Sequence, residues 1–127
     1  MATRLLLDTH ALLWWLAGDS RLPSSIRSRI EDADAVVWAS AASAWEISIK
    51  AKLGKLKIPG NLFETVQASG IGWISVEPEE AYAAGQLPMH HRDPFDRLLV
   101  VQARTRSAHL VSRDGVLDGY EVDRIWE

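Results

Sequence analysis

The chain has 127 residues, 47% of them apolar and 24% charged, as in an ordinary globular domain. It contains no cysteine, which excludes disulfides and thiolate metal sites and favours a reducing cytoplasm. The net charge of −3 excludes a polycation that binds nucleic acid through bulk charge. The apolar runs are too short for a signal peptide or a membrane span, so we expect one cytoplasmic domain over residues 1–127, with no membrane partner.

Apolar runs alternate with amphipathic segments along the chain. A run that is apolar throughout is typical of a strand covered on both faces, and apolar residues three and four apart are typical of a helix. Glycine and proline mark several expected helix ends. In chain order we expect strands at 3–7, 35–40, 72–77, 108–112 and 121–126, and helices at about 10–17, from Pro23, at about 43–53, from Leu62, at 78–87 and at 93–107.

Alternating strands and helices without two-residue hairpin turns predict an α/β sandwich with a parallel sheet. In such a sheet, ligands bind beyond the carboxyl ends of the strands. Acidic residues that follow strands are therefore the first candidates for a functional site.

Three aspartates are candidates at this edge of the sheet. Asp8 ends the first strand, but it equally suits the N-cap of the next helix. Asp114 follows the strand at 108–112, although an Asp-Gly pair taken alone favours a simple turn. Asp96 lies in the first turn of a helix whose N-cap is better assigned to Asp93. Capping of that helix therefore does not require Asp96.

Glu46 is the fourth candidate, and it has two structural interpretations. It follows Ser43 by three residues, which is the spacing of a capping box, and on its own Glu46 is best interpreted that way. It also precedes Lys50 by one helical turn, so the two could form an exposed ion pair.

The four acids together point to a metal. Four converging carboxylates would repel one another unless a cation lay between them. Mg²⁺ or Mn²⁺ is the natural occupant, because both take oxygen ligands. The histidines, by contrast, show no zinc-ligand spacing, and we interpret the pair His90 and His91 as an exposed loop.

Four segments of the chain resemble the PIN-domain nucleases, and specifically the VapC-like toxins of type II toxin–antitoxin systems. In order they are LLLDTHALLWWL, SAWEISIKAKLGKL, HHRDPFDRLLVVQA and LVSRD, and the resemblance covers nearly the whole chain. It implies a three-layer α/β/α sandwich with a short, mainly parallel central sheet. It also implies Mg²⁺- or Mn²⁺-dependent endoribonuclease activity, a VapB-like antitoxin as partner, and a homodimer.

The resemblance also implies which residues carry out the chemistry. Residue by residue, the catalytic and metal-binding acids would be Asp8, Glu46, Asp96 and Asp114. We assign the principal metal to Asp8 and Asp96, and we expect the other two to complete the site, one of them orienting the attacking water. Lys50 and Arg97 are the expected RNA-binding cations.

Two other functions stay open from the sequence. One is a module on the same fold that binds RNA or protein without cleaving. The other is a phosphatase that forms an aspartyl-phosphate on Asp8, but His10 stands where such enzymes have a second acid.

Overall fold

A sheet of five parallel strands forms the centre of the molecule, in the order β3-β2-β1-β4-β5. The structure is a computed structural model, and it describes residues 2–58 and 60–127. The strands are β1 (Arg4–Leu7), β2 (Val36–Ser40), β3 (Gly72–Ile74), β4 (His109–Val111) and β5 (Arg124–Ile125). The predicted parallel sheet is confirmed.

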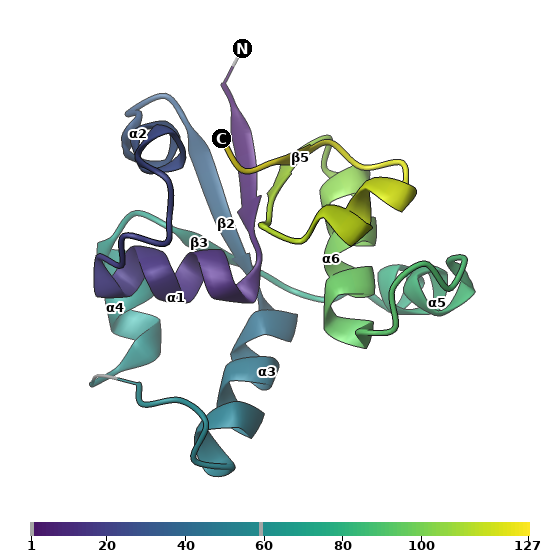
Figure 1. The fold of residues 1–127 in the computed structure, drawn as a ribbon, viewed down its shortest axis with the longest axis horizontal. Helices are drawn as coiled ribbons and strands as arrows, with labels where there is room; N and C mark the ends of the chain where they lie inside the picture. The colour runs from purple at the N-terminus through teal and green to yellow at the C-terminus, as the bar shows by residue number, and fades with distance from the viewer. Residues whose placement is uncertain (1, 59) are drawn as a thin grey trace.

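Helices connect these strands and cover both faces of the sheet (Figure 1). They are α1 (Thr9–Ala17), α2 (Ser24–Glu31), α3 (Ala41–Lys52), α4 (Leu62–Ala68), α5 (Pro78–Gln86), α6 (Pro94–Thr105) and the 3₁₀ helix η1 (Gly115–Gly119). In the described part of the chain, no helix has the length and apolar character needed to cross a membrane.

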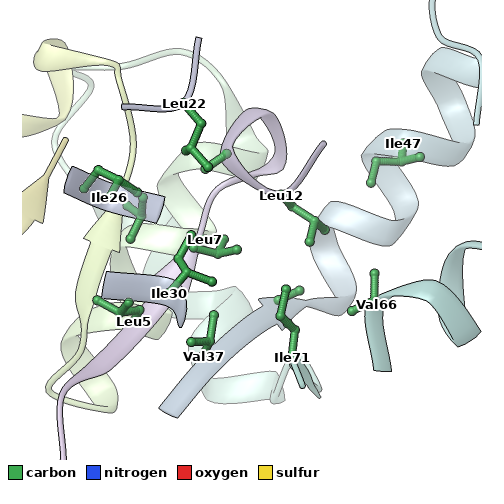
Figure 2. Packing of buried hydrophobic residues seen from close by; sticks show 13 residues of the cluster. Leu5, Leu7, Leu12, Leu22, Ile26, Ile30, Val37, Ile47, Val66 and Ile71 are labelled. Atoms are coloured by element: carbon green, nitrogen blue, oxygen red, sulfur yellow. The ribbon is translucent and has the colours of Figure 1, made fainter. Parts of the chain in front are cut away.

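The three consecutive leucines of β1 explain the layered arrangement. Side chains alternate between the faces of a strand, so Leu5 and Leu7 point one way and Leu6 the other. Leu5 and Leu7 belong to a cluster with residues of α1, α2, α3 and α4, as Figure 2 shows. Leu6 packs against residues of α6 and η1. All three leucines are fully buried, each worth about 1.5–3 kcal/mol, so β1 joins two cores and the fold is a three-layer sandwich.

The ends of several elements differ from the expected ones. The strands expected at 72–77 and 121–126 are shorter, because only Gly72–Ile74 and Arg124–Ile125 pair with a neighbour. Pro23 lies at the N-cap of α2 rather than inside the helix. The turn expected after β4 is longer and forms η1.

The topology brings several chain segments to one edge of the sheet. The carboxyl ends of β1 and β4 are tied together there, because the Asp8 amide donates to the Val111 carbonyl oxygen at 3.0 Å. Helix α6 leads into the parallel strand β4 and therefore begins at this same edge. Side chains at the start of α1, after β4 and at the start of α6 can consequently converge.

Candidate active site

Asp8 lies where β1 ends and α1 begins. Its Oδ1 accepts a hydrogen bond from the Ala11 amide at 2.8 Å, so the predicted capping role is confirmed. The residue is only 5% exposed. Burial raises the pKa of Asp8 above its ordinary value, even though hydrogen bonds from the Ala11 amide and the Ser112 hydroxyl act to lower it. Capping therefore does not fully compensate the buried charge.

Asp96 lies in the first turn of α6, where Asp93 provides the cap as predicted. The Oδ1 atom of Asp93 accepts hydrogen bonds from the amides of Phe95 and Asp96, at 2.9 and 3.4 Å. Burial, followed by the negative charges of Asp93 and Asp8, raises the pKa of Asp96 to about 7. The Asp96 carboxyl is thus held where its negative charge is poorly compensated.

Asp114 follows β4 and has a different electrostatic environment. It caps η1 by accepting a hydrogen bond from the Val116 amide at 3.0 Å. Its Oδ2 lies 2.6 Å from Nε2 of His91. Partial burial acts to raise the pKa of Asp114, but the hydrogen bonds from His91 and Val116 outweigh it and hold this pKa below its usual range.

These three aspartates line one cleft of about 610 Å³ at the carboxyl edge of the sheet. The other residues that line it are His10, Trp14, His91, Asp93, Arg113 and Gly115. Single ligand atoms of His91, Asp96 and Asp114 lie within 4.8 Å of one another. Several carboxylate oxygens around one cleft are the donor set that Mg²⁺ and Mn²⁺ prefer, and a cation there would relieve the repulsion around Asp96. The residues present therefore fit a hard divalent cation.

Glu46 lies beside this cleft, and its predicted capping box is wrong. Strand β2 runs directly into α3, so the helix begins at Ala41 with Ser40 as its N-cap, and Ser43 lies inside it. The Glu46 carboxylate is buried, and it accepts hydrogen bonds from Thr9 Oγ1 at 2.6 Å and from Lys50 Nζ at 2.7 Å. The expected pair with Lys50 exists, but its acid is buried rather than exposed.

Glu46 acts on the cleft through its charge. It lines a neighbouring cavity of about 370 Å³ together with Lys50 and Arg92. Its negative charge nevertheless contributes to the raised pKa values of Asp8 and Asp96. The structure thus groups all four predicted acids, with three in the cleft and the fourth next to it.

The two predicted RNA-binding cations lie in different places. The Lys50 side chain is 32% exposed at the neighbouring cavity. The Arg97 side chain is buried, and it donates to the carbonyl oxygens of Leu87 at 2.9 Å and Gly85 at 3.4 Å. Consecutive helical residues point about 100° apart, so Arg97 faces α5 although Asp96 faces the cleft. The structure does not bring Arg97 to the acids.

His91 is the site residue that the sequence interpretation missed. We expected an exposed loop, but the His91 side chain is only 16% exposed and contacts two of the acids. The residue lies between helices, where no periodic pattern indicates burial. Its position two residues before the Asp93 cap was the one available signal.

Comparison with known proteins places the chain that carries this acidic cleft in a family. The PIN-domain family model matches residues 5–122, and the chain belongs to this family. It is 31% identical to Ribonuclease VapC22 of Mycobacterium tuberculosis (strain ATCC 25618 / H37Rv) over 116 residues, which is 88% of each chain. The predicted family and fold are therefore confirmed.

Solved structures share this fold at low sequence identity. The crystal structure of VapBC2 from Rickettsia felis bound to a promoter DNA fragment matches with a TM-score of 0.65 at 14% identity, covering 98% of both chains. A toxin–antitoxin complex from Klebsiella pneumoniae matches with a TM-score of 0.64 at 16% identity, covering 92% of both chains. At these identities the structural likeness concerns the fold alone.

Proposed function

We propose that this chain is a Mg²⁺- or Mn²⁺-dependent endoribonuclease that acts as the toxin of a type II toxin–antitoxin pair. The observation that carries the proposal is the cleft in which Asp8, Asp96 and Asp114 converge, with the pKa of Asp96 raised to about 7. Such an excess of negative charge is typical of a site that binds a cation, which in turn contacts the phosphate of a substrate. The ribonuclease relative supports RNA as the substrate.

Each acid has a proposed role that follows from its surroundings. Asp8 and Asp96 would hold the metal, because Asp8 is buried, the Asp96 side chain is only 19% exposed, and neither has a Lys or Arg ion-pair partner among the described residues. Asp114, more exposed and ionised at neutral pH, would complete the metal site at the mouth of the cleft. Glu46, fixed by Thr9 and Lys50, would hold the water that attacks the phosphorus.

The chemistry that Mg²⁺ or Mn²⁺ supplies when bound is a lower pKa of a coordinated water and neutralisation of the phosphate charge. The chain itself fixes its carboxylates on rigid supports, since Asp8 and Asp114 are held by the amides that they cap. Asp96 is held by its place on α6. Such prior fixing lowers the cost of ordering the site around substrate.

RNA would approach across the Glu46 side of the cleft. Lys50 and Arg92 line the cavity beside Glu46 and could neutralise flanking phosphates. We do not include Arg97 in this surface, because its guanidinium is bonded to backbone carbonyls beside α5. With so few cations, affinity for RNA should depend only weakly on salt concentration.

We further propose an antitoxin partner, a homodimer and action in the cytoplasm. Solved structures of the same fold include toxin–antitoxin complexes, which supports a protein partner. The Trp45 side chain on α3 is 66% exposed and contacts Phe95 edge-on. An exposed tryptophan of this kind suits a protein interface.

The test is incubation of the purified protein with total RNA in Mg²⁺ or Mn²⁺, with a chelator control. Asp96→Asn is the inactivating variant, and Glu79→Gln on the exposed face of α5 is its matched control. We expect fragments only with metal, and only from the wild type and the control. RNA bound equally by all three proteins without fragments would instead favour a binding module. An aspartyl-phosphate trapped on Asp8 would favour a phosphatase.

A further inference from the structure

The loop from residue 87 to residue 93 joins α5 to α6 and places His91 in the cleft. The His91 amide donates to Tyr120 Oη at 3.0 Å, and the Tyr120 hydroxyl donates to the Pro88 carbonyl oxygen at 2.6 Å. Tyr120 is itself buried in the core beside η1. Tyr120 therefore holds the loop backbone at two points, the Pro88 carbonyl and the His91 amide.

The imidazole ring of His91 is fixed at both nitrogens. Its Nδ1 lies 3.0 Å from the Asp93 amide, and its Nε2 lies 2.6 Å from Asp114 Oδ2 and 3.4 Å from Asp96 Oδ2. A backbone amide can only donate, so Nδ1 must be the acceptor and carry no proton. The ring proton is then on Nε2, where it is directed at the carboxylates.

This hydrogen-bond chain connects three separate elements of the site. It runs from the Asp93 amide at the start of α6, through the ring, to Asp114 after β4. Asp93 has two roles in it, since its side chain caps α6 while its amide fixes the ring of His91. The distance between the acids of α6 and of the β4–η1 connection therefore depends on His91.

We propose that His91 is a positioning residue that holds the Asp114 carboxylate beside Asp96 by donating from Nε2. This inference rests on the proposed metal-dependent function. Direct metal ligation by Nε2 is disfavoured, because a nitrogen that carries a proton has no free lone pair for a cation. Donation from an imidazole to a carboxylate ligand instead fixes the orientation of that ligand, as outer hydrogen-bond partners do in metal sites.

Two substitutions separate the donor from the shape of the ring. His91→Gln keeps an N–H donor that can reach Asp114 but removes the ring, whereas His91→Phe keeps the ring shape and removes both nitrogens. Glu79→Gln on the exposed face of α5 is the control, because the neighbouring His90 packs against Tyr120, which fixes the loop. Mn²⁺ binding to each protein is measured by calorimetry without RNA, and thermal unfolding in chelator confirms that each protein is folded.

We expect His91→Phe to weaken Mn²⁺ binding by about tenfold to a hundredfold, as loss of an outer hydrogen-bond partner does. His91→Gln should stay within about threefold of the wild type, and Glu79→Gln should be unchanged. Wild-type affinity in His91→Phe would overturn the proposal, because shape alone would then suffice. An equal loss in both His91 variants would also overturn it, because the imidazole itself would then be required.

A second measurement tests the tautomer directly. The ¹⁵N spectrum of histidine-labelled protein with Mg²⁺ should show the His91 proton on Nε2, and a proton on Nδ1 would overturn the proposal. Cleavage assays keep this proposal separate from the proposed function. A protein that cuts RNA while His91→Phe binds Mn²⁺ normally refutes only the role of His91. Mn²⁺ binding that depends on His91 without any RNA cleavage refutes only the ribonuclease.

Discussion

Glu80 on α5 and Asp96 on α6 are both largely buried acids on neighbouring helices, with side chains 6% and 19% exposed. Burial alone would raise the pKa of each. For Glu80, hydrogen bonds from Arg106, the backbone and Gln102 outweigh burial, and its pKa lies below the ordinary value. For Asp96 the neighbours are further acids, and its pKa is raised to about 7.

The difference shows what the fold does with a buried charge. Arg106 neutralises Glu80, and Gln102 donates a further hydrogen bond to it, so side chains of the protein fully compensate the charge of this carboxylate. Among the residues that the structure describes, the one positive counterpart of Asp96 is a weakly placed His91 nitrogen at 3.4 Å. A buried acid whose charge is neutralised by another side chain of the protein stabilises the fold. A buried acid without such a partner is available for an external cation. Glu46 is an intermediate case, because it is neutralised by Lys50, whose own side chain is partly exposed to solvent.

The largest expected effect tests whether Asp96, unlike Glu80, is needed for RNA cleavage. Asp96→Asn should lower metal-dependent RNA cleavage by at least about 100-fold, because loss of a ligand should exceed the tenfold to hundredfold effect of losing a ligand's hydrogen-bond partner. Glu80→Gln should keep the wild-type rate per folded molecule. Initial rates on one labelled RNA at saturating Mn²⁺ measure both. Equal losses in the two variants would contradict the distinction.

Glu80→Gln should instead reduce stability. The substitution leaves the largely buried Arg106 guanidinium without its charged partner, which costs about 3 kcal/mol for a buried pair. Urea unfolding measures the loss, with Glu79→Gln on the same helix as the control for removing an exposed acid. Less than about 0.5 kcal/mol of difference between the two variants would show that the pair is not structural.

The raised pKa of Asp96 predicts a pH-dependent stability in chelator. The folded carboxyl binds its proton more tightly than the unfolded one, so between about pH 4 and pH 7 the folded state holds more protons and the free energy of unfolding falls as pH rises. Asp96→Asn removes this loss. Between pH 4 and pH 8, the free energy of unfolding of this variant should rise by about 1–2 kcal/mol relative to that of the wild type, allowing for solvent screening. A pH-independent difference in urea unfolding would contradict the raised pKa.

The smallest expected effect concerns Lys50, the partner of the intermediate acid Glu46. Lys50→Ala should weaken RNA binding in chelator and reduce the slope of log affinity against log salt by about 1, since one phosphate contact is lost. Lys52→Ala, an exposed lysine on the same helix, should leave the slope unchanged. Fluorescence anisotropy over a salt series measures it. Identical slopes for the two variants would remove Lys50 from the RNA surface.

Much of the architecture follows from local patterns in the sequence. The apolar run at 5–7 requires a strand buried on both faces, and alternation with amphipathic helices then predicts parallel order. Asp8 and Asp114 follow strands, and parallel strands end at one edge, so their convergence is predictable. Asp93 as the cap of α6 is also a local feature, because a cap depends on only the next few residues.

The sequence alone predicted an α/β sandwich with a parallel sheet, the strand ends that carry Asp8 and Asp114, and Asp93 as the cap of α6, because each depends on periodicity or on neighbours within one turn. Only the tertiary structure decided that Ser40 rather than Ser43 caps α3, because the end of β2 is set by pairing with its neighbours. It also decided that Arg97 turns to the α5–α6 loop while His91 enters the cleft. Those positions depend on contacts between segments distant in the sequence, which no local pattern records.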